Sequence, residues 1–276
     1  MDNFCWSVGT YTCKNQTKGC FNPTEENKVY QRYYQWISLV FIIQAIIMYM
    51  PAYLWKITEG GLMHKICNDL DAIFKQDKWN MKKNILIDYF KSQYVDRMHM
   101  KYVQHFIILK MLSFAFILFN IFLLSIIIPG FWSQYYKAIS ALLAGDMINW
   151  LIHIEKNFSI TGKCTFEPYR PSGTIQQFDA LCLLPLNILN QKLFLIVWLC
   201  YILQIIISFL NLLFWLIITL SENARIYILY QEAQKSVSHE AIENASRKAR
   251  LGHFFVLSQI ARNTNPGTFI ELVSNF

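Results

Sequence analysis

The side chains that could do acid–base, nucleophilic or metal chemistry are scattered along this chain. Its six histidines, at positions 64, 99, 105, 153, 239 and 253, do not have the spacing of metal ligands. The segment HEAIE (His239–Glu243) begins like a zinc-protease motif, but Glu243 stands where the second histidine is needed. Phosphate-binding loops, G-x-S-x-G elbows and Rossmann glycine patterns are also missing from the sequence. The sequence therefore predicts no catalytic residues, no cofactor and no metal site.

The cysteines indicate a different kind of chemistry. Five of the seven fall in two segments, 1–32 and 129–192, namely Cys5, Cys13, Cys20, Cys164 and Cys182. Clustered cysteines favour disulfides in an oxidising compartment, although an odd number leaves at least one without a partner there, and buried free thiols are the alternative. The same two segments hold glycosylation sequons at Asn15 and Asn157.

Three charge-free apolar stretches separate these segments. They are Trp36–Trp55, Met111–Ile128 and Leu193–Leu220, of 20, 18 and 28 residues. About 20 apolar residues in a helix cross a hydrocarbon core of roughly 30 Å. Buried helices of a soluble core rarely stay uncharged on every face for so long. We therefore predict an all-α polytopic membrane protein with three transmembrane helices.

The positive charges predict the orientation of these helices. Of the 25 Lys and Arg residues, 16 lie in 56–110 and after Leu220, against 9 in 1–35 and 129–192. Positively charged flanks stay on the cytoplasmic side. The predicted order is an outer segment 1–32, a span 33–56, a cytoplasmic loop 57–105, a span 106–128, an outer loop 129–192, a span 193–220 and a cytoplasmic tail 221–276. The net charge of +7 then reflects topology and attraction to membrane lipid, and it does not indicate nucleic-acid binding.

Polar and aromatic residues mark the spans. The stretch YYQW, Tyr33, Tyr34, Gln35 and Trp36, stands where water gives way to lipid and is typical of an interfacial aromatic belt. Pro51 predicts a kink near the inner end of the first span. The uncharged polar residues inside the spans are Gln44, Asn120, Gln204 and Asn211. Interhelical hydrogen bonds explain them best, and lining a water-filled pore is the alternative.

The two cytoplasmic segments have helical periodicity. Helices are predicted within 57–101 and at Ile226–Gln234, Ala241–Arg250 and Phe254–Ala261, and Asn265-Pro266 provides the start of a last short helix. Because these helices are amphipathic, we expect them to pack together in a cytoplasmic dome or against neighbouring subunits.

Several of these motifs together resemble the innexin family. The resemblance rests on YYQW before a span ending YMPAYLWK, on EGGL (Glu59–Leu62), on the loop Lys163–Lys192 and on the tail GHFFVLSQIARNTNPGTF. Within the loop, the residues that fit the pattern include Cys164, Pro171, Ser172, Gly173, Cys182, Pro185 and Asn187, whereas Gln191 stands where the family usually has Glu. NFCW (Asn3–Trp6) looks like the end of the first extracellular loop, so the match runs essentially from residue 3 to 276.

The resemblance implies a structural subunit of a gap junction channel or hemichannel in the plasma membrane. About eight subunits would form a ring that docks to a ring of an adjacent cell and passes ions and small metabolites passively. The docking loop would include Pro171, Ser172, Gly173, Pro185 and Asn187. The alternative is a non-channel membrane adaptor that recruits partners through its cytoplasmic helices.

The resemblance also implies disulfides and an absence. Cys5 should pair with Cys164, and Cys182 should pair with a loop-one cysteine that this chain lacks. Cys13 or Cys20 could replace that cysteine, or Cys13 and Cys20 could pair with each other and leave Cys182 free. Relative to the family pattern, we expect this chain to lack the N-terminal helix, the first span and the first part of extracellular loop one. We expect an incomplete or modulatory form of the subunit.

Overall fold

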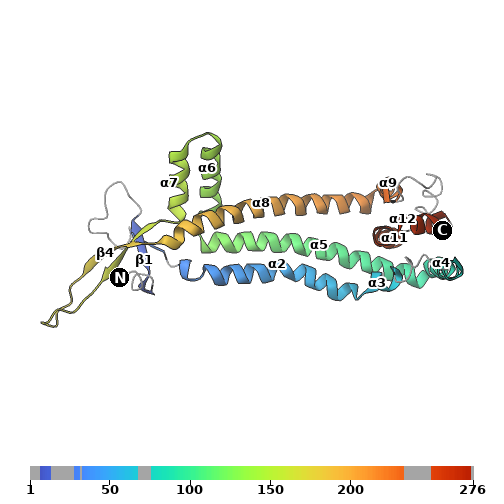
Figure 1. The fold of residues 1–276 in the computed structure, drawn as a ribbon, viewed down its shortest axis with the longest axis horizontal. Helices are drawn as coiled ribbons and strands as arrows, with labels where there is room; N and C mark the ends of the chain where they lie inside the picture. The colour runs from blue at the N-terminus through green and yellow to red at the C-terminus, as the bar shows by residue number, and fades with distance from the viewer. Residues whose placement is uncertain (1–6, 14–27, 32, 68–75, 233–249, 275–276) are drawn as a thin grey trace. The chain divides into compact units, whose positions relative to one another are not determined.

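The computed structural model describes residues 7–13, 28–31, 33–67, 76–232 and 250–274. They belong to two compact units, one made of 1–47 and 117–205 and the other of 48–116 and 206–276. Three long helices contribute to both units, α2 (Ile37–Glu59), α5 (Gln93–Ile127) and α8 (Pro185–Leu220) (Figure 1). Each is long and apolar enough to cross a membrane, as the three apolar stretches predict.

Two of these helices are longer than the spans predicted from hydropathy. α5 starts at Gln93 rather than at 106, and α8 starts at Pro185 rather than at 193. At 1.5 Å per residue each is about 50 Å long, which exceeds a hydrocarbon core of roughly 30 Å. A hydropathy pattern marks only the apolar segment of each helix, whereas the helix itself continues through the polar residues that flank this segment.

α2 contains Pro51 within its last turns. Proline has no N–H to donate to the carbonyl four residues earlier, here that of Ile47, so the helix is weakened at this point. The helix nevertheless runs without a break to Glu59, and the kink at Pro51 stays a prediction.

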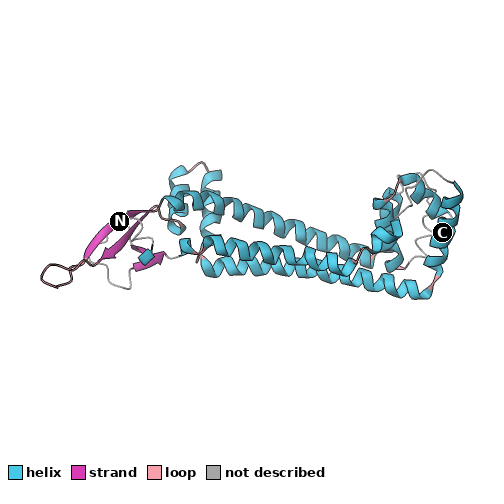
Figure 2. Cartoon of the chain, turned by 60° about the horizontal axis from the view of Figure 1, so that its bottom comes forward, coloured by secondary structure: helices cyan, strands magenta, loops and turns pink. Residues whose placement is uncertain are grey.

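The first unit contains a four-stranded antiparallel sheet, which the all-α prediction did not include (Figure 2). Its order is β2 (Lys28–Gln31), β1 (Thr10–Cys13), β3 (Thr161–Phe166) and β4 (Phe178–Leu183). β1 and β3 approach closely at Gly162, where an added Cβ would lie 2.9 Å from Thr10 Cβ. Pairing between such distant segments leaves little local signal in the sequence.

A helical hairpin and a 3-10 turn complete the first unit. α6 (Phe131–Leu143) and α7 (Met147–Asn157) are antiparallel, and the turn η3 (Tyr33–Gln35) precedes α2. Gly145, with φ of 78°, ends α6, and the Asp146 carboxylate accepts from Asn149 N at 3.1 Å to cap α7.

An aromatic core joins these elements. The rings of Phe158 and Phe194 stack with centroids 4.9 Å apart, and Phe131 and Tyr135 lie beside them. All four side chains are buried, so they fix α6, α7 and the start of α8 relative to one another.

The second unit packs shorter helices against parts of the long ones. They are α3 (Leu62–Cys67), α4 (Gln76–Lys91), α9 (Glu222–Glu232), α11 (Leu251–Asn263) and α12 (Pro266–Ser274). α11 is central, because Phe254, Phe255, Val256 and Leu257 are all buried although they point in successive directions around the helix. The helices predicted at 254–261 and after Asn265 are confirmed as α11 and α12. The predicted helix Ala241–Arg250 falls almost entirely outside the described residues.

Candidate functional site

The hairpin between β3 and β4 presents its tip to solvent. Strand pairing runs from Thr161↔Leu183 to Phe166↔Phe178, and an isolated bridge joins Tyr169 to Ile175. At the tip, Arg170 N donates to Thr174 O at 2.9 Å and Gly173 N donates to Arg170 O at 2.8 Å. Pro171 suits the start of such a turn, and Gly173 supplies the positive φ of 78° that closes it.

Side-chain hydrogen bonds order this exposed hairpin. Arg170 Nε donates to Gln176 Oε1 at 2.6 Å, and Gln177 Nε2 donates to Glu167 Oε1 at 2.7 Å. Pro171, Ser172 and Gly173, which the resemblance assigns to the docking loop, are exposed. The tip is therefore a polar, ordered projection.

β4 forms an edge of the described sheet and exposes apolar side chains. Leu181 and Leu183 are 74% and 64% exposed, and Phe178 is 48% exposed. An exposed apolar edge strand offers both backbone hydrogen-bonding groups and apolar surface to another chain.

Asn187 occupies a different place from the hairpin tip, although both were predicted in the docking loop. It is buried in the first turn of α8, where its Nδ2 donates to Ser159 O at 2.7 Å and to Tyr33 Oη at 3.3 Å. Asn190 Nδ2 donates to Asn187 Oδ1 at 3.3 Å. Pro185 is exposed and begins the same helix. Asn187 thus holds α8 against the end of α7 and η3.

The four YYQW residues differ in how far their side chains are buried. Tyr33 donates from Oη to the Asn157 carbonyl at 2.9 Å, and its ring meets Phe158 edge to face. Tyr34 and Gln35 are half-buried, whereas Trp36 is 59% exposed. Trp36 therefore suits the predicted aromatic belt, while Tyr33 is committed to internal hydrogen bonds.

The two cysteines of the hairpin are buried together. Cys164 of β3 lies opposite Ala180, and Cys182 of β4 lies opposite Gly162, so both project from the same face of the sheet. Cys5 and Cys20 lie outside the described residues, as does the side chain of Cys13, which ends β1. The pairing of Cys5 with Cys164 and the partner of Cys182 stay predictions.

The structure describes only one of the two predicted glycosylation sites. Asn15 lies outside the described residues. Asn157 ends α7 and is only 9% exposed. A side chain this buried is a poor acceptor for a glycan in the folded protein, so the structure does not favour glycosylation at Asn157.

The polar residues of the spans fall into two groups. Gln44 and Asn120 are buried, and Gln44 Nε2 donates to Asn120 O at 3.5 Å, which joins α2 to α5. Gln204 of α8 is exposed, and Asn211 Oδ1 is buried without a hydrogen bond. A polar side chain in lipid without a partner costs free energy, so these two residues of α8 are not explained by contacts within the chain.

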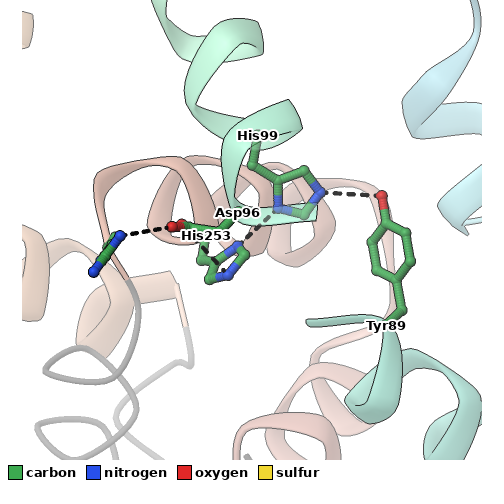
Figure 3. Close-up of polar contacts among 5 residues, drawn as sticks. Tyr89, Asp96, His99 and His253 are labelled. Carbon is green, nitrogen blue, oxygen red and sulfur yellow. Dashed lines mark hydrogen bonds and ion pairs between the residues drawn. The ribbon is translucent and has the colours of Figure 1, made fainter. Parts of the chain in front are cut away.

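The second unit contains a buried polar cluster that the sequence analysis did not predict. His99 of α5 and His253 of α11 face each other with their Nδ1 atoms 2.9 Å apart (Figure 3). Tyr89 Oη lies 3.2 Å from His99 Nε2, and Asp96 Oδ1 lies 3.6 Å from His253 Nε2. Arg250 pairs with Asp96 Oδ2 at 3.0 Å. Across the described residues, no three His, Cys, Asp or Glu side chains are arranged to hold a metal ion.

The C-terminal end of α2 is closed by its own last residue. The Glu59 carboxylate accepts from Gly61 N and from Met63 N, both at 2.8 Å, and so caps α3. Gly60 and Gly61 have φ of 56° and 75°, which other residues rarely adopt. This geometry explains the EGG motif.

Comparison with known proteins decides the family. The innexin family model matches residues 1–276. The chain belongs to the innexin family. It is 34% identical to innexin inx4 of Anopheles gambiae over 289 residues, covering 100% of this chain and 74% of that protein. It is 32% identical to innexin inx4 of Drosophila melanogaster, over 98% of this chain and 77% of the relative. Innexin inx2 of Schistocerca americana is 30% identical, over 100% of this chain and 79% of that relative.

Membership confirms the resemblance that the motifs predicted. The innexin family is one of gap junction channel subunits and not one of enzymes.

Gln191 stands where the resemblance led us to expect a glutamate, and the structure shows how the glutamine is used. Its side-chain Nε2 donates to the Phe158 backbone carbonyl at 2.7 Å, and its backbone carbonyl accepts from Tyr135 Oη at 3.0 Å. An ionised glutamate could not make the first bond, because it has no hydrogen to donate. Gln191 therefore ties α8 to the aromatic core.

Proposed function

We propose that this innexin is a structural subunit of a gap junction channel or hemichannel in the plasma membrane. About eight subunits form a ring, and the ring passes ions and small metabolites passively. The innexin match over residues 1–276 is the observation that carries the proposal. The segments 1–32 and 129–192 lie outside the cell, and 57–105 and 221–276 lie in the cytoplasm.

The exposed apolar surface of the spans supports assembly in a ring. Only 11% to 17% of the most apolar window of each long helix is buried within the chain. Lipid can cover most of that surface, but Gln204 on α8 needs a polar partner or water. A neighbouring subunit or an aqueous pore would supply it.

The hairpin of β3 and β4 supports docking between cells. We assign docking to its exposed tip, Pro171, Ser172 and Gly173, and to the edge strand β4. Asn187 is left out of this assignment because it is buried and its side chain is used inside the subunit. The Cys5–Cys164 disulfide would hold the hairpin stem to the first outer segment.

Paired cells test this function. The chain is expressed alone and together with a second innexin, surface delivery is verified, and junctional current and dye transfer are recorded. We expect current or dye transfer with the chain alone, or a changed unitary conductance when the second innexin is present. Surface expression that leaves both quantities unchanged would favour the adaptor, whose spans only anchor its cytoplasmic helices.

A further inference from the structure

The N-terminal part of α11 lies unusually close to α5. A Cβ added at Gly252 would lie 2.7 Å from Met100 N and 2.9 Å from the carbonyl carbon of His99. These are backbone atoms and cannot move aside as a flexible side chain would. The contact is therefore set by the absence of a side chain at residue 252, and it brings the next residue, His253, against His99.

The hydrogen bond between the two facing rings limits how many protons can be added to them. A hydrogen bond between two Nδ1 atoms 2.9 Å apart needs a hydrogen on one of them and a lone pair on the other. With one added proton the bond survives, because His253 can donate from both ring nitrogens while His99 accepts at Nδ1. With two added protons both Nδ1 atoms carry hydrogens, so the bond is lost and two positive charges face each other at this distance.

The surrounding groups favour the first proton on His253. Asp96 Oδ1 is buried without a hydrogen bond, and His253 Nε2 lies 3.6 Å from it, so an imidazolium there would meet a carboxylate. Burial lowers the pKa of His253, Asp96 raises it and Arg250 lowers it. Among the described residues, no carboxylate lies within hydrogen-bonding distance of His99, and Tyr89 Oη is the partner of its Nε2.

Other titratable groups around this contact are more exposed or engaged elsewhere. The exposed ones are His64 and Lys65 of α3, Asp88 of α4, and Arg97 and Lys101 of α5. Glu232 of α9 accepts from Ser258 Oγ at 3.1 Å and from Arg262 Nε at 2.7 Å. Glu271 of α12 is half-buried. Asp96 and Arg250 are thus the charged groups that act on the histidine pair at close range.

We propose that His99 and His253 form a proton-binding site that keeps α11 docked on α5 while at most one ring is protonated, and releases α11 when both are. Since burial lowers the pKa of His253 below that of an exposed histidine, the docked ring takes up a proton less readily than the released one. The stability that this gives the docked state is present above the ordinary histidine pKa of about 6.5 and declines as the pH falls below it. This inference concerns the C-terminal helices and does not depend on channel activity.

Hydrogen exchange of the full chain in lipid nanodiscs tests the proposal. Protection of the α11 amides is compared at pH 7.5 and pH 5.0, after correction for the intrinsic pH dependence of exchange. We expect protection of residues 251–263 to fall at least about ten-fold at pH 5.0, while α6 in the other unit stays protected. His99→Gln and His253→Gln should each reduce the fall to less than about two-fold, because glutamine keeps a donor and an acceptor without gaining charge.

Controls separate this site from general acid sensitivity. His105→Gln alters an exposed histidine on the same helix and should leave the ten-fold fall unchanged. Retained protection in the unaltered chain at pH 5.0, or a full fall in both variants, would overturn the proposal. If both variants lack protection already at pH 7.5, histidine NMR of the unaltered chain decides. For the proposal to hold, His99 and His253 must both take up protons over the pH range in which α11 opens. Protonation of either histidine outside that range would refute the site.

Discussion

At the scale of single residues, Gln191 shows how one atom decides which side chain fits. Its Nε2 donates to the Phe158 carbonyl, so Gln191→Glu should replace an attraction by repulsion between two acceptors. We expect a loss of about 1–3 kcal/mol in the free energy of unfolding at pH 7, which shrinks as the glutamate is protonated at acidic pH. Thermal unfolding in detergent measures both effects.

Gln176→Glu is the matched control for this substitution. Gln176 uses its Oε1 to accept from Arg170 Nε, and a carboxylate keeps that role. This variant should therefore be as stable as the unaltered chain. Equal losses for the two substitutions would contradict the donor role of Gln191.

Gly252 supports a second prediction at this scale. Gly252→Ala should cost about 1–3 kcal/mol, because the new Cβ meets backbone atoms of His99 and Met100. Proteolysis or hydrogen exchange should show α11 opening at neutral pH. Gly267→Ala in α12 has nothing within 4 Å of its new Cβ and should be neutral or slightly stabilising. Similar behaviour of the two variants would exclude tight packing at Gly252.

At the scale of elements, the β3–β4 hairpin depends on its turn. Gly173→Ala places a Cβ on a residue with φ of 78° and should strain the tip by about 1–2 kcal/mol, although nothing lies within 4 Å of the new atom. We expect junctional conductance between paired cells to fall while hemichannel current in single cells persists.

Gly145→Ala is the control for strain itself. Gly145 has the same φ of 78° and the same open surroundings, but it lies in the turn between α6 and α7. This variant should keep junctional conductance. A similar loss from both substitutions would show that conductance follows general stability and not the hairpin tip.

The sequence predicted some elements of the fold and missed others. The long helices have charge-free stretches that can be recognised locally, and α12 begins at the proline that follows Asn265. β1 and β3 pair over about 150 residues, and His99 meets His253 across 154, so no local pattern marks either contact. Asn187 was found through the family motif, but its buried role depends on Ser159 and Tyr33, which only the fold brings near.

At the scale of the whole molecule, most of the apolar surface of the three long helices is left uncovered within one chain. Gln204 lies near the middle of the apolar stretch 193–220, at the depth where water is scarcest. An interhelical hydrogen bond in a membrane contributes about 1 kcal/mol, and a closed ring repeats that contribution at every interface. Small losses per subunit are therefore multiplied in the assembled ring.

Gln204→Leu should consequently weaken the ring, if the amide bonds to a neighbouring subunit. We expect native mass spectrometry or cross-linking to show a shift from rings to smaller species, with each subunit as stable as before. Ile207→Leu changes a neighbouring exposed residue without removing a polar group and should leave the ring intact. Intact rings with altered conductance would instead place Gln204 on the pore, and intact rings with unchanged conductance would refute both roles.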